Sequence, residues 1–238
     1  MNIAIVGYGK MGKEIERIAQ DRGHHIVLKI DENNVNSVIS ENLKNVDVAI
    51  EFSVPQSAFT NISLMLDHKV PVVSGTTGWV DKLDLIIERC KNDKGTFFYA
   101  SNYSIGVNLF FNLNKKLARL MNHFPDYEIS IEETHHSQKI DAPSGTAITL
   151  ANDLIQAIDH KEEWKKEKAE SEESIVIKSY REGTVPGNHK VIYESSFDKI
   201  TIEHDAKSRK GFAIGAVLAA EFIKDKKGYF TMNELLKI

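Results

Sequence analysis

Proton-donating and cationic side chains are concentrated in one short segment in the middle of the chain, residues 132–147. His135 and His136 are adjacent, and Lys139 follows four residues after the first histidine. An imidazolium or ammonium group can donate a proton to a reacting atom, and the ammonium also supplies fixed positive charge. These residue types therefore favour proton transfer to a negatively charged substrate.

An anion-binding element follows directly. Pro143-Ser144-Gly145-Thr146 leads into a helical pattern, and the first backbone amides of a helix have no acceptor within the helix. Together with the neighbouring hydroxyl groups they can bind a carboxylate. Pro-Ser before a helix is also common as a simple N-cap, so the anion-binding interpretation depends on the acid groups beside it.

A metal site formed by Glu133, His135 and His136 is the alternative use of the same segment. Adjacent residues on a strand point to opposite faces, and the spacing of these three matches no common zinc pattern. We therefore predict proton transfer and no bound metal. A hydrolase is also disfavoured, because the chain has no G-x-S-x-G motif and no recognisable Cys/His pairing.

A glycine-rich turn near the N-terminus predicts a dinucleotide site. The sequence Gly7-Tyr8-Gly9-Lys10-Met11-Gly12 lies between a predicted strand and a predicted helix. Glycines in such a turn allow a tight bend, close approach of a pyrophosphate, and close packing of helix on strand. Asp31 follows the second predicted strand, where an acidic side chain can bind the adenosine ribose hydroxyls.

The residues around Asp31 also bear on which cofactor is used. Asp31-Glu32-Asn33-Asn34 contains no basic residue to neutralise a 2′-phosphate, so we predict that NADH is preferred. Lys29 and Lys10 are the cations that could reach a 2′-phosphate, so NADPH stays open as a second cofactor. Two loops at predicted strand ends are expected to approach the nicotinamide: Gly75-Thr76-Thr77-Gly78 and Ala100-Ser101-Asn102-Tyr103-Ser104.

The elements that position these residues form two patterns. Strands at 3–6, 26–30, 46–52, 70–74 and 96–100 alternate with helices at 11–21, 56–67 and 82–90, which predicts a doubly wound parallel sheet of the Rossmann type. Helices at 107–121 and 145–158 and strands at 127–133, 174–178, 189–196 and 199–203 predict an α+β domain with a mostly antiparallel sheet. The charged segment 161–174 is expected to be a solvated loop or helix end, and 212–223 an apolar helix.

Composition limits the class of protein and its partners. The 238 residues are 42% hydrophobic and 27% charged, which is typical of a folded globular protein. The net charge of −4 provides no basic surface for nucleic acid or an anionic membrane. A single cysteine and a strand pattern directly after Met1 favour a cytoplasmic location.

Together these motifs resemble the 4-hydroxy-tetrahydrodipicolinate reductase family, also called dihydrodipicolinate reductases. The block from His135 to Ala147, H-H-x-x-K-x-D-A-P-S-G-T-A, carries most of the resemblance. The glycine turn and the 75–78 and 102–108 segments match in the same order. Further matches are Arg181-Glu182-Gly183, Gly187-Asn188-His189 and the segment from His204 to Arg209.

The resemblance implies a dinucleotide-binding domain of residues 1–104 and 213–238, and an inserted substrate-binding and tetramerisation domain of residues 105–212. It implies a homotetramer that reduces a cyclic unsaturated dicarboxylic imine with NADH or NADPH, in the diaminopimelate route to lysine. His135 would be the proton donor and Lys139 its partner acid. Substrate carboxylates would contact His136, Lys139, Ser144, Gly145 and Thr146. The implied cofactor contacts are Gly7, Tyr8, Gly9, Lys10, Met11, Gly12, Asp31, Gly75, Thr76, Thr77, Ala100, Ser101, Asn102 and Tyr103.

Three positions depart from the family pattern. Glu51-Phe52-Ser53 stands where Asp-Phe-Thr is expected, Tyr103 replaces the usual phenylalanine, and the Asp31 loop lacks a basic residue. Two other functions stay open, an amino-acid dehydrogenase acting on a substrate such as aspartate and a nucleotide-sensing module without catalysis. The histidine and lysine beside an anion site argue against both.

Overall fold

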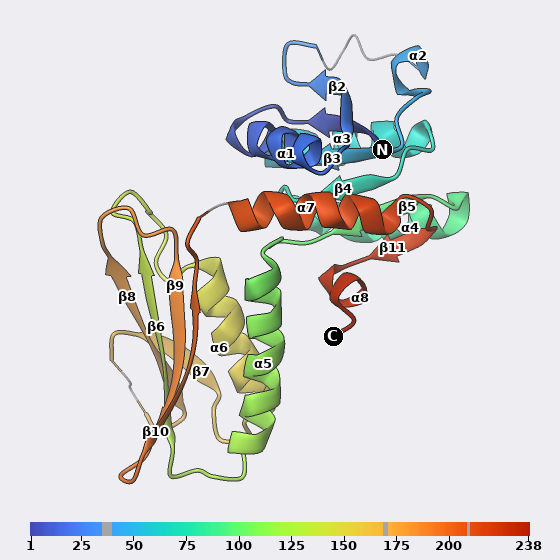
Figure 1. The fold of residues 1–238 in the computed structure, drawn as a ribbon. Helices are drawn as coiled ribbons and strands as arrows, with labels where there is room; N and C mark the ends of the chain where they lie inside the picture. Colours follow the sequence, from blue (N-terminus) through green and yellow to red (C-terminus); the bar gives the residue numbers. More distant parts are fainter. Residues whose placement is uncertain (35–39, 169–170, 209) are drawn as a thin grey trace. The chain divides into compact units, whose positions relative to one another are not determined.

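The computed structural model describes residues 1–34, 40–168, 171–208 and 210–238. The chain divides into two compact units, Met1–Ile105 with Lys210–Ile238, and Gly106–Arg209. The first is a doubly wound α/β unit and the second an α+β unit (Figure 1), which confirms the predicted fold class. Within the described ranges, no helix has both the length and the apolar character needed to cross a membrane.

The first unit contains a parallel sheet of six strands. In chain order they are β1 (Asn2–Val6), β2 (His25–Ile30), β3 (Val48–Glu51), β4 (Val72–Ser74), β5 (Thr96–Tyr99) and β11 (Gly228–Phe230). Their order across the sheet is β2-β1-β3-β4-β5-β11, so the winding direction reverses between β1 and β3. Ligands of such sheets bind at the carboxyl ends of the strands beside the reversal.

Helices cover both faces of this sheet, because the central strands are apolar on both sides. The helices α1 (Lys10–Asp21), α7 (Lys210–Ile223) and α8 (Met232–Leu236) pack on the face that includes Ile5 and Ile50. The helices α2 (Ser40–Leu43), α3 (Pro55–Asp67) and α4 (Leu83–Asp93) pack on the face of Ala4 and Val72, and the short η2 (Val80–Lys82) precedes α4. The C-terminal segment thus completes the core of the first unit.

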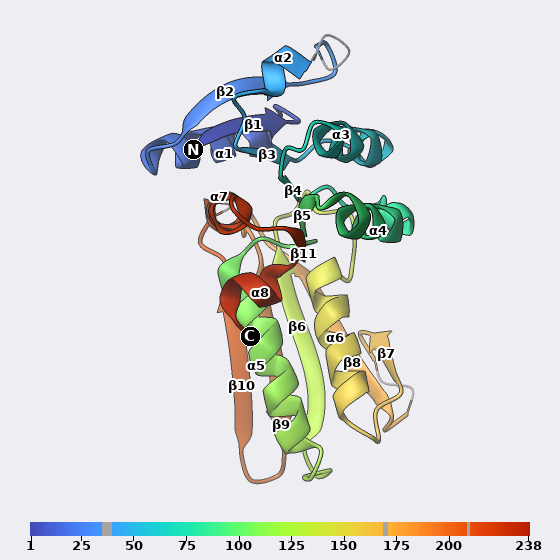
Figure 2. The same cartoon turned by 90° about the vertical axis from the view of Figure 1, so that its right-hand side faces the viewer.

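The second unit is a five-stranded sheet with two helices on one face (Figure 2). Its strands are β6 (Glu128–His135), β7 (Glu163–Lys166), β8 (Ser174–Arg181), β9 (Asn188–Glu194) and β10 (Lys199–Asp205), in the order β10-β9-β6-β8-β7. The helices are α5 (Ile105–Met121) and α6 (Gly145–Ala157). Along β6, residues 129, 131, 133 and 135 are buried in alternation, so Glu133 and His135 occupy the same face of the strand as the core residues Ile129 and Ile131.

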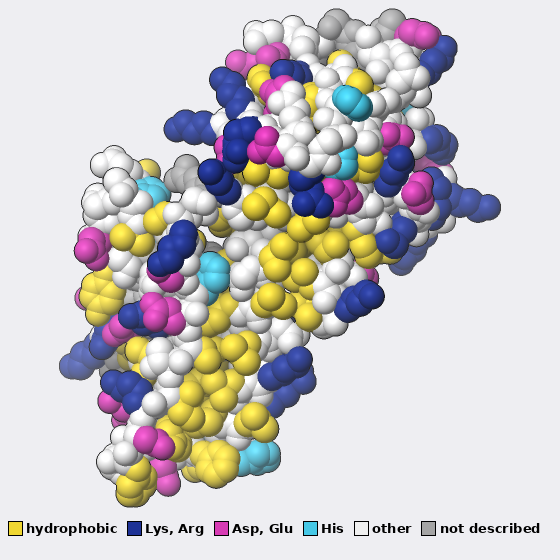
Figure 3. Space-filling view, viewed as in Figure 1, with side chains coloured by type: hydrophobic (Ala, Val, Ile, Leu, Met, Phe, Trp, Pro, Cys, Tyr) yellow, Lys and Arg dark blue, Asp and Glu magenta, His cyan; other side chains and the backbone are white. Residues whose placement is uncertain are grey.

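Apolar side chains are exposed along α5 in the single chain, and Figure 3 shows them gathered over this helix. They are Leu109, Leu113, Leu120 and, just beyond the helix, Phe124.

Several sequence predictions for the elements were wrong. The sheet of the second unit is mixed, because β6 pairs antiparallel with β9 but parallel with β8, and β7 pairs parallel with β8. Within the charged segment, Glu163–Lys166 forms the edge strand β7 and Lys161 is buried, whereas residues 169 and 170 lie outside the described ranges. The strand β11 and helix α8 were not predicted. Arg209, one of the residues in the family resemblance, also lies outside the described ranges.

Candidate active site

The glycine turn lies at the reversal of the first sheet, between the ends of β1 and β3. Gly7 has φ of 94° and donates its N–H to the carbonyl of Ile30 at 2.8 Å. A Cβ atom on Gly7 would stand 2.1 Å from the carbonyl oxygen of Phe52, and one on Gly12 would stand 2.4 Å from the carbonyl oxygen of Gly7. Both positions therefore require glycine, one for the turn and one for the close packing of α1.

Gly9 has a different role, because its surroundings leave open space. It is the N-cap residue of α1 and has no side chain to cap the first turn. A Cβ atom there would meet no described heavy atom within 4 Å. Open space beside the amides of a helix N-terminus fits the pyrophosphate of a dinucleotide.

The lysine nearest in sequence to Asp31 already has an acidic partner. The ammonium of Lys29 lies 2.7 Å from Glu16 Oε1 and 4.7 Å from the ring centroid of Tyr8. Lys29 holds the pKa of Glu16 below its ordinary value. Asp31 begins a tight loop in which its Oδ1 accepts the N–H of Asn33 at 2.9 Å. The charge that Lys29 could offer a 2′-phosphate is thus balanced within the protein.

Glu51, at the end of β3, is a buried hydrogen-bond acceptor that the sequence reasoning missed. Its carboxylate accepts the Ser53 N–H at 3.0 Å, the Ser74 hydroxyl at 2.6 Å and the Thr76 hydroxyl at 2.8 Å. These bonds join the loops that follow β3 and β4. The predicted cofactor residue Thr76 is therefore held by its side chain, while the next residue, Thr77, is exposed.

Tyr103 uses its hydroxyl inside the protein. The side chain is buried, and its hydroxyl donates to the carbonyl of Ser74 at 2.7 Å. Burial raises the pKa of Tyr103 well above its ordinary value. The extra hydroxyl at this position thus fastens the 100–104 loop to β4, and of the other predicted loop residues Ala100 is buried and Ser101 exposed.

In the second unit, Glu133 is the centre of a buried polar cluster. It lies opposite Ser179 of β8 and His189 of β9 in the register of the sheet. Its carboxylate is fully buried and accepts a hydrogen bond from the Ser179 hydroxyl at 2.7 Å. The Ser144 N–H donates to both of its oxygens, at 3.0 and 3.1 Å. Burial alone would raise the pKa of Glu133, but the bonds from Ser144 and Ser179 hold it below its ordinary value.

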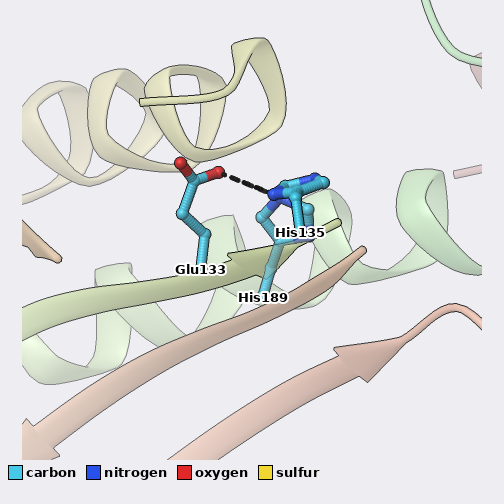
Figure 4. A group of neighbouring side chains, drawn as sticks. All are labelled: Glu133, His135 and His189. Atoms are coloured by element: carbon cyan, nitrogen blue, oxygen red, sulfur yellow. Dashed lines mark ion pairs between the residues drawn. The ribbon is translucent and has the colours of Figure 1, made fainter. Parts of the chain in front are cut away.

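His135 lies on the same face of β6, two residues after Glu133. Its Nδ1 is 3.4 Å from Glu133 Oε2, and its ring centroid is 5.0 Å from that of His189 (Figure 4). His189 Nε2 is 3.1 Å from the Ser144 hydroxyl. Burial lowers the pKa of His135, opposed by Glu133, and lowers the pKa of His189 to about 4. His189 is consequently neutral at pH 7.

The structure groups Glu133, His135 and His189, rather than the trio with His136 that was weighed as a metal site. One potential donor atom from each lies within 4.8 Å of the others. Glu133 already accepts hydrogen bonds from Ser144 and Ser179, and His189 Nε2 bonds the Ser144 hydroxyl. His135 Nδ1 and His189 Nδ1 have no hydrogen-bond partner among the described residues.

Lys139 lies in the loop between β6 and α6, where Arg181 fixes the backbone. Its ammonium contacts the two carboxylate oxygens of Asp141 at 2.7 and 2.8 Å. Arg181 donates to the carbonyls of Lys139 at 3.2 Å and Asp141 at 2.6 Å. The Lys139 ammonium is thus paired with the Asp141 carboxylate, the same type of group that a dicarboxylate substrate would present to it.

The predicted anion element is the N-terminus of α6. Ser144 is the N-cap residue, and its hydroxyl accepts the Ala147 N–H at 3.2 Å. Gly145 and Thr146 are the first two residues of the helix, and a Cβ atom on Gly145 would meet no described heavy atom within 4 Å. His136 follows the end of β6 and is partly buried. Free space beside first-turn amides fits a bound carboxylate.

The buried His189 makes stability depend on acidity. Its pKa of about 4 lies below the value of about 6.5 in an unfolded chain, so the unfolded state binds the extra proton. The free energy of unfolding should therefore fall by about 2–3 kcal/mol between pH 7 and pH 4.5 through this group alone. Denaturant titrations of His189→Gln should show a loss smaller by that amount. A His123→Gln control, at an exposed position, should lose as much unfolding free energy over this pH range as the native protein. An equal loss in all three proteins would contradict the prediction.

Comparison with known proteins places these features in a family. The model for the N-terminal part of dihydrodipicolinate reductase matches residues 1–103, and the model for the C-terminal part matches residues 106–236. A 4-hydroxy-tetrahydrodipicolinate reductase of Christiangramia forsetii is 52% identical over 236 residues, 99% of this chain and 98% of the relative. The reductase of Thermosipho africanus is 34% identical over 239 residues, 100% of this chain and 98% of the relative.

A solved structure has the same fold. The dipicolinate-bound dihydrodipicolinate reductase from Paenisporosarcina sp. TG-14 has a TM-score of 0.77 and 24% identity. The match covers 97% of both chains.

Proposed function

The chain belongs to the dihydrodipicolinate reductase family, and from this premise we propose how its own residues carry out the reaction. The enzyme is an oxidoreductase that uses a pyridine nucleotide to reduce 4-hydroxy-tetrahydrodipicolinate, a cyclic dicarboxylate, in lysine biosynthesis. An amino-acid dehydrogenase and a sensing module without catalysis are set aside, because relatives identical at up to 52% over nearly the whole chain carry the reductase name.

His135 is the proposed proton donor and Lys139 the proposed partner acid. A dihydronicotinamide bound here would supply a hydride, and electron density of the conjugated imine would then shift toward the ring nitrogen. The ammonium of Lys139 would stabilise that negative charge, and the imidazolium form of His135 would deliver a proton to carbon and become neutral. The observation that carries this proposal is the placement of His135 beside a buried carboxylate, 3.4 Å from Glu133, on the strand that leads to Lys139.

The α6 N-terminus and its loop are the proposed site for the substrate carboxylates. The amides of Gly145 and Thr146 supply the helix dipole, and Ser144 is held in place by its bond to Glu133. His136 and Lys139 supply further donors from the loop, and a substrate carboxylate would replace Asp141 on the Lys139 ammonium. The Lys139 ammonium thereby keeps a carboxylate partner.

The cofactor is proposed to bind along the glycine turn of the first unit. The amides around Gly9 bind the pyrophosphate, with Tyr8, Lys10 and Met11 beside it and Asp31 on the ribose. The nicotinamide end is assigned to the loops joined by Glu51. Its proposed contacts are Gly75, Thr76, Thr77, Ala100, Ser101, Asn102 and Tyr103.

A homotetramer formed through the second unit is also proposed. The two helices of this unit cover one face of its sheet (Figure 2), and Tyr180 of β8 is exposed on the opposite face of the single chain. A sheet face with exposed apolar groups is suited to association with further copies.

The reaction and its cofactor are tested in one coupled assay, in which the upstream condensation product is generated in place. We expect oxidation of NADH at 340 nm, with a kcat/KM about tenfold or more above that for NADPH, because a 2′-phosphate would meet the Asp31 carboxylate while Lys29 is paired with Glu16. The variant Asn33→Arg adds a cation at an exposed position of this loop, and should raise kcat/KM for NADPH only. A preference of the native enzyme for NADPH would contradict the cofactor assignment.

A further inference from the structure

A carboxylate at position 133 is unfavourable for folding, because a charge there must be desolvated, and its presence therefore suggests a functional role. It occupies an inward position of β6 after Ile129 and Ile131, where an apolar side chain would fill the core without desolvating a charge. The buried face of the strand thus changes from apolar to polar at its carboxyl end, immediately before His135. A side chain retained at this cost is expected to act on its neighbours.

The two oxygens of Glu133 have different surroundings. Oε1 accepts the Ser179 hydroxyl at 2.7 Å and lies 3.6 Å from Arg181 Nη2. Oε2 faces the two imidazoles, at 3.4 Å from His135 Nδ1 and 3.7 Å from His189 Nε2. Ser144 N–H lies within 3.1 Å of both oxygens. The carboxylate is therefore immobilised by α6 and β8, with one oxygen left for the histidines.

The nitrogens of His135 are also unlike. Nδ1 is fully buried and has no hydrogen-bond partner among the described residues, and the Glu133 carboxylate is in ion-pair contact with it at 3.4 Å. Nε2 lies on the other side of the ring, beside Gly187, where an added Cβ would stand 3.1 Å away. Because glycine has no side chain, nothing from residue 187 covers Nε2. The ring thus presents one nitrogen to the buried carboxylate and the other to the space beside Gly187.

We propose that Glu133 is the positioning residue of the proton donor: it holds the proton of His135 on Nδ1 and leaves Nε2 as the nitrogen that serves the substrate. The inference deepens the proposed function and rests on the assignment of His135 as the acid. When Nε2 gives up its proton, the neutral ring keeps Nδ1–H directed at Glu133. When the ring is protonated again, the carboxylate stabilises the imidazolium. His189, neutral and bonded to Ser144, ties the same carboxylate to the helix that is proposed to bind the substrate.

Glu133 is also the main group that favours a charged His135. Burial and the nearby cations Lys139 and Arg181 disfavour the imidazolium, and the exposed Asp141 adds only a small opposing effect. Removing the charge of Glu133 should therefore make His135 a weaker base that is protonated only at lower pH. The groups that face His135 from the surrounding elements are Glu133, Lys139, Asp141, Arg181 and His189.

The pH dependence of kcat/KM in Glu133→Gln tests the inference. The rate falls as pH rises through the pKa of the proton donor, so this alkaline limb should move about one unit or more toward lower pH. At pH 7.5 kcat should fall about 100-fold, with the dissociation constant of NADH, measured by fluorescence, within twofold of the native value. Glu133→Asp keeps the negative charge. It should therefore have higher activity than Glu133→Gln, and its alkaline limb should lie close to the native pH.

Glu132→Gln is the matched control, because it removes the same charge from the adjacent position of β6, whose side chain points to the opposite face. It should leave both kcat and the alkaline limb unchanged. A limb in Glu133→Gln that coincides with the native one, or an equal shift in Glu132→Gln, would overturn the inference.

A measurement on the native enzyme covers the case in which the variants do not fold. Nitrogen-15 NMR of the histidines, with the His135 signal identified by its loss in His135→Asn, should show the neutral ring protonated on Nδ1. A proton on Nε2 would overturn the inference while leaving the reductase activity intact. If His135→Asn instead keeps native kcat, the assignment of the acid fails and the inference fails with it.

Discussion

Replacement of His135 by asparagine is expected to lower kcat by about 10²–10⁴-fold, the usual contribution of a general acid. Asparagine is of similar size and polar, but it carries no group that acts as an acid at neutral pH. Cofactor affinity should change little, because His135 belongs to the 106–209 unit and the glycine turn to the other. Steady-state kinetics with saturating substrate, combined with direct titration of NADH, separates the two effects.

The control for this variant is another histidine of the same unit. His123 is exposed just beyond α5, and His123→Asn should keep native kcat and native NADH affinity. A His135→Asn enzyme whose only defect is weaker NADH binding would contradict the role assigned to this residue. So would a loss of kcat that is equal in the two variants.

The first unit was largely predictable because its signals are local. Each strand from β1 to β5 is a short apolar run beside an amphipathic helix, and the glycines of the turn follow β1 directly. The strand β11 was missed because it has only three residues, Gly228–Phe230, and pairs with a strand more than 120 positions earlier. The strand β7 was missed because it lies at a sheet edge, where charged side chains such as Glu163 and Lys165 face solvent and pair at 3.0 Å.

The polar cluster shows what sequence reasoning could not reach. His135 and Ser144 were identified from types and spacing within one segment. The partners Ser179 and His189 come from two other strands, and only the register of β8 and β9 places them beside Glu133. One signal was present, since the alternation Ile129, Ile131, Glu133, His135 puts a carboxylate on the apolar face of a strand. This alternation identifies Glu133 as a charged residue on a buried face, but it does not indicate which residues contact it.

The glycine turn gives the second large expected effect, through a pair of alanine variants. Gly12→Ala brings a methyl group to 2.4 Å from the Gly7 carbonyl oxygen, so α1 must move away from the turn. We expect it to lose both stability, by about 1–3 kcal/mol as in other overpacked sites, and most of its NADH affinity. Gly9→Ala introduces its methyl group into open space at φ of −85°, outside the positive-φ region that favours glycine.

The contrast between the two variants locates the pyrophosphate. Gly9→Ala should have the same melting temperature as the native protein. It should nevertheless bind NADH about tenfold more weakly, because the methyl group occupies the space that the phosphates need beside the α1 amides. Thermal unfolding and fluorescence titration of the same samples measure both quantities, and activity lost through weak binding should return at high NADH. If Gly9→Ala binds NADH as tightly as the native enzyme, the phosphates do not approach this helix end, and the cofactor site must lie elsewhere.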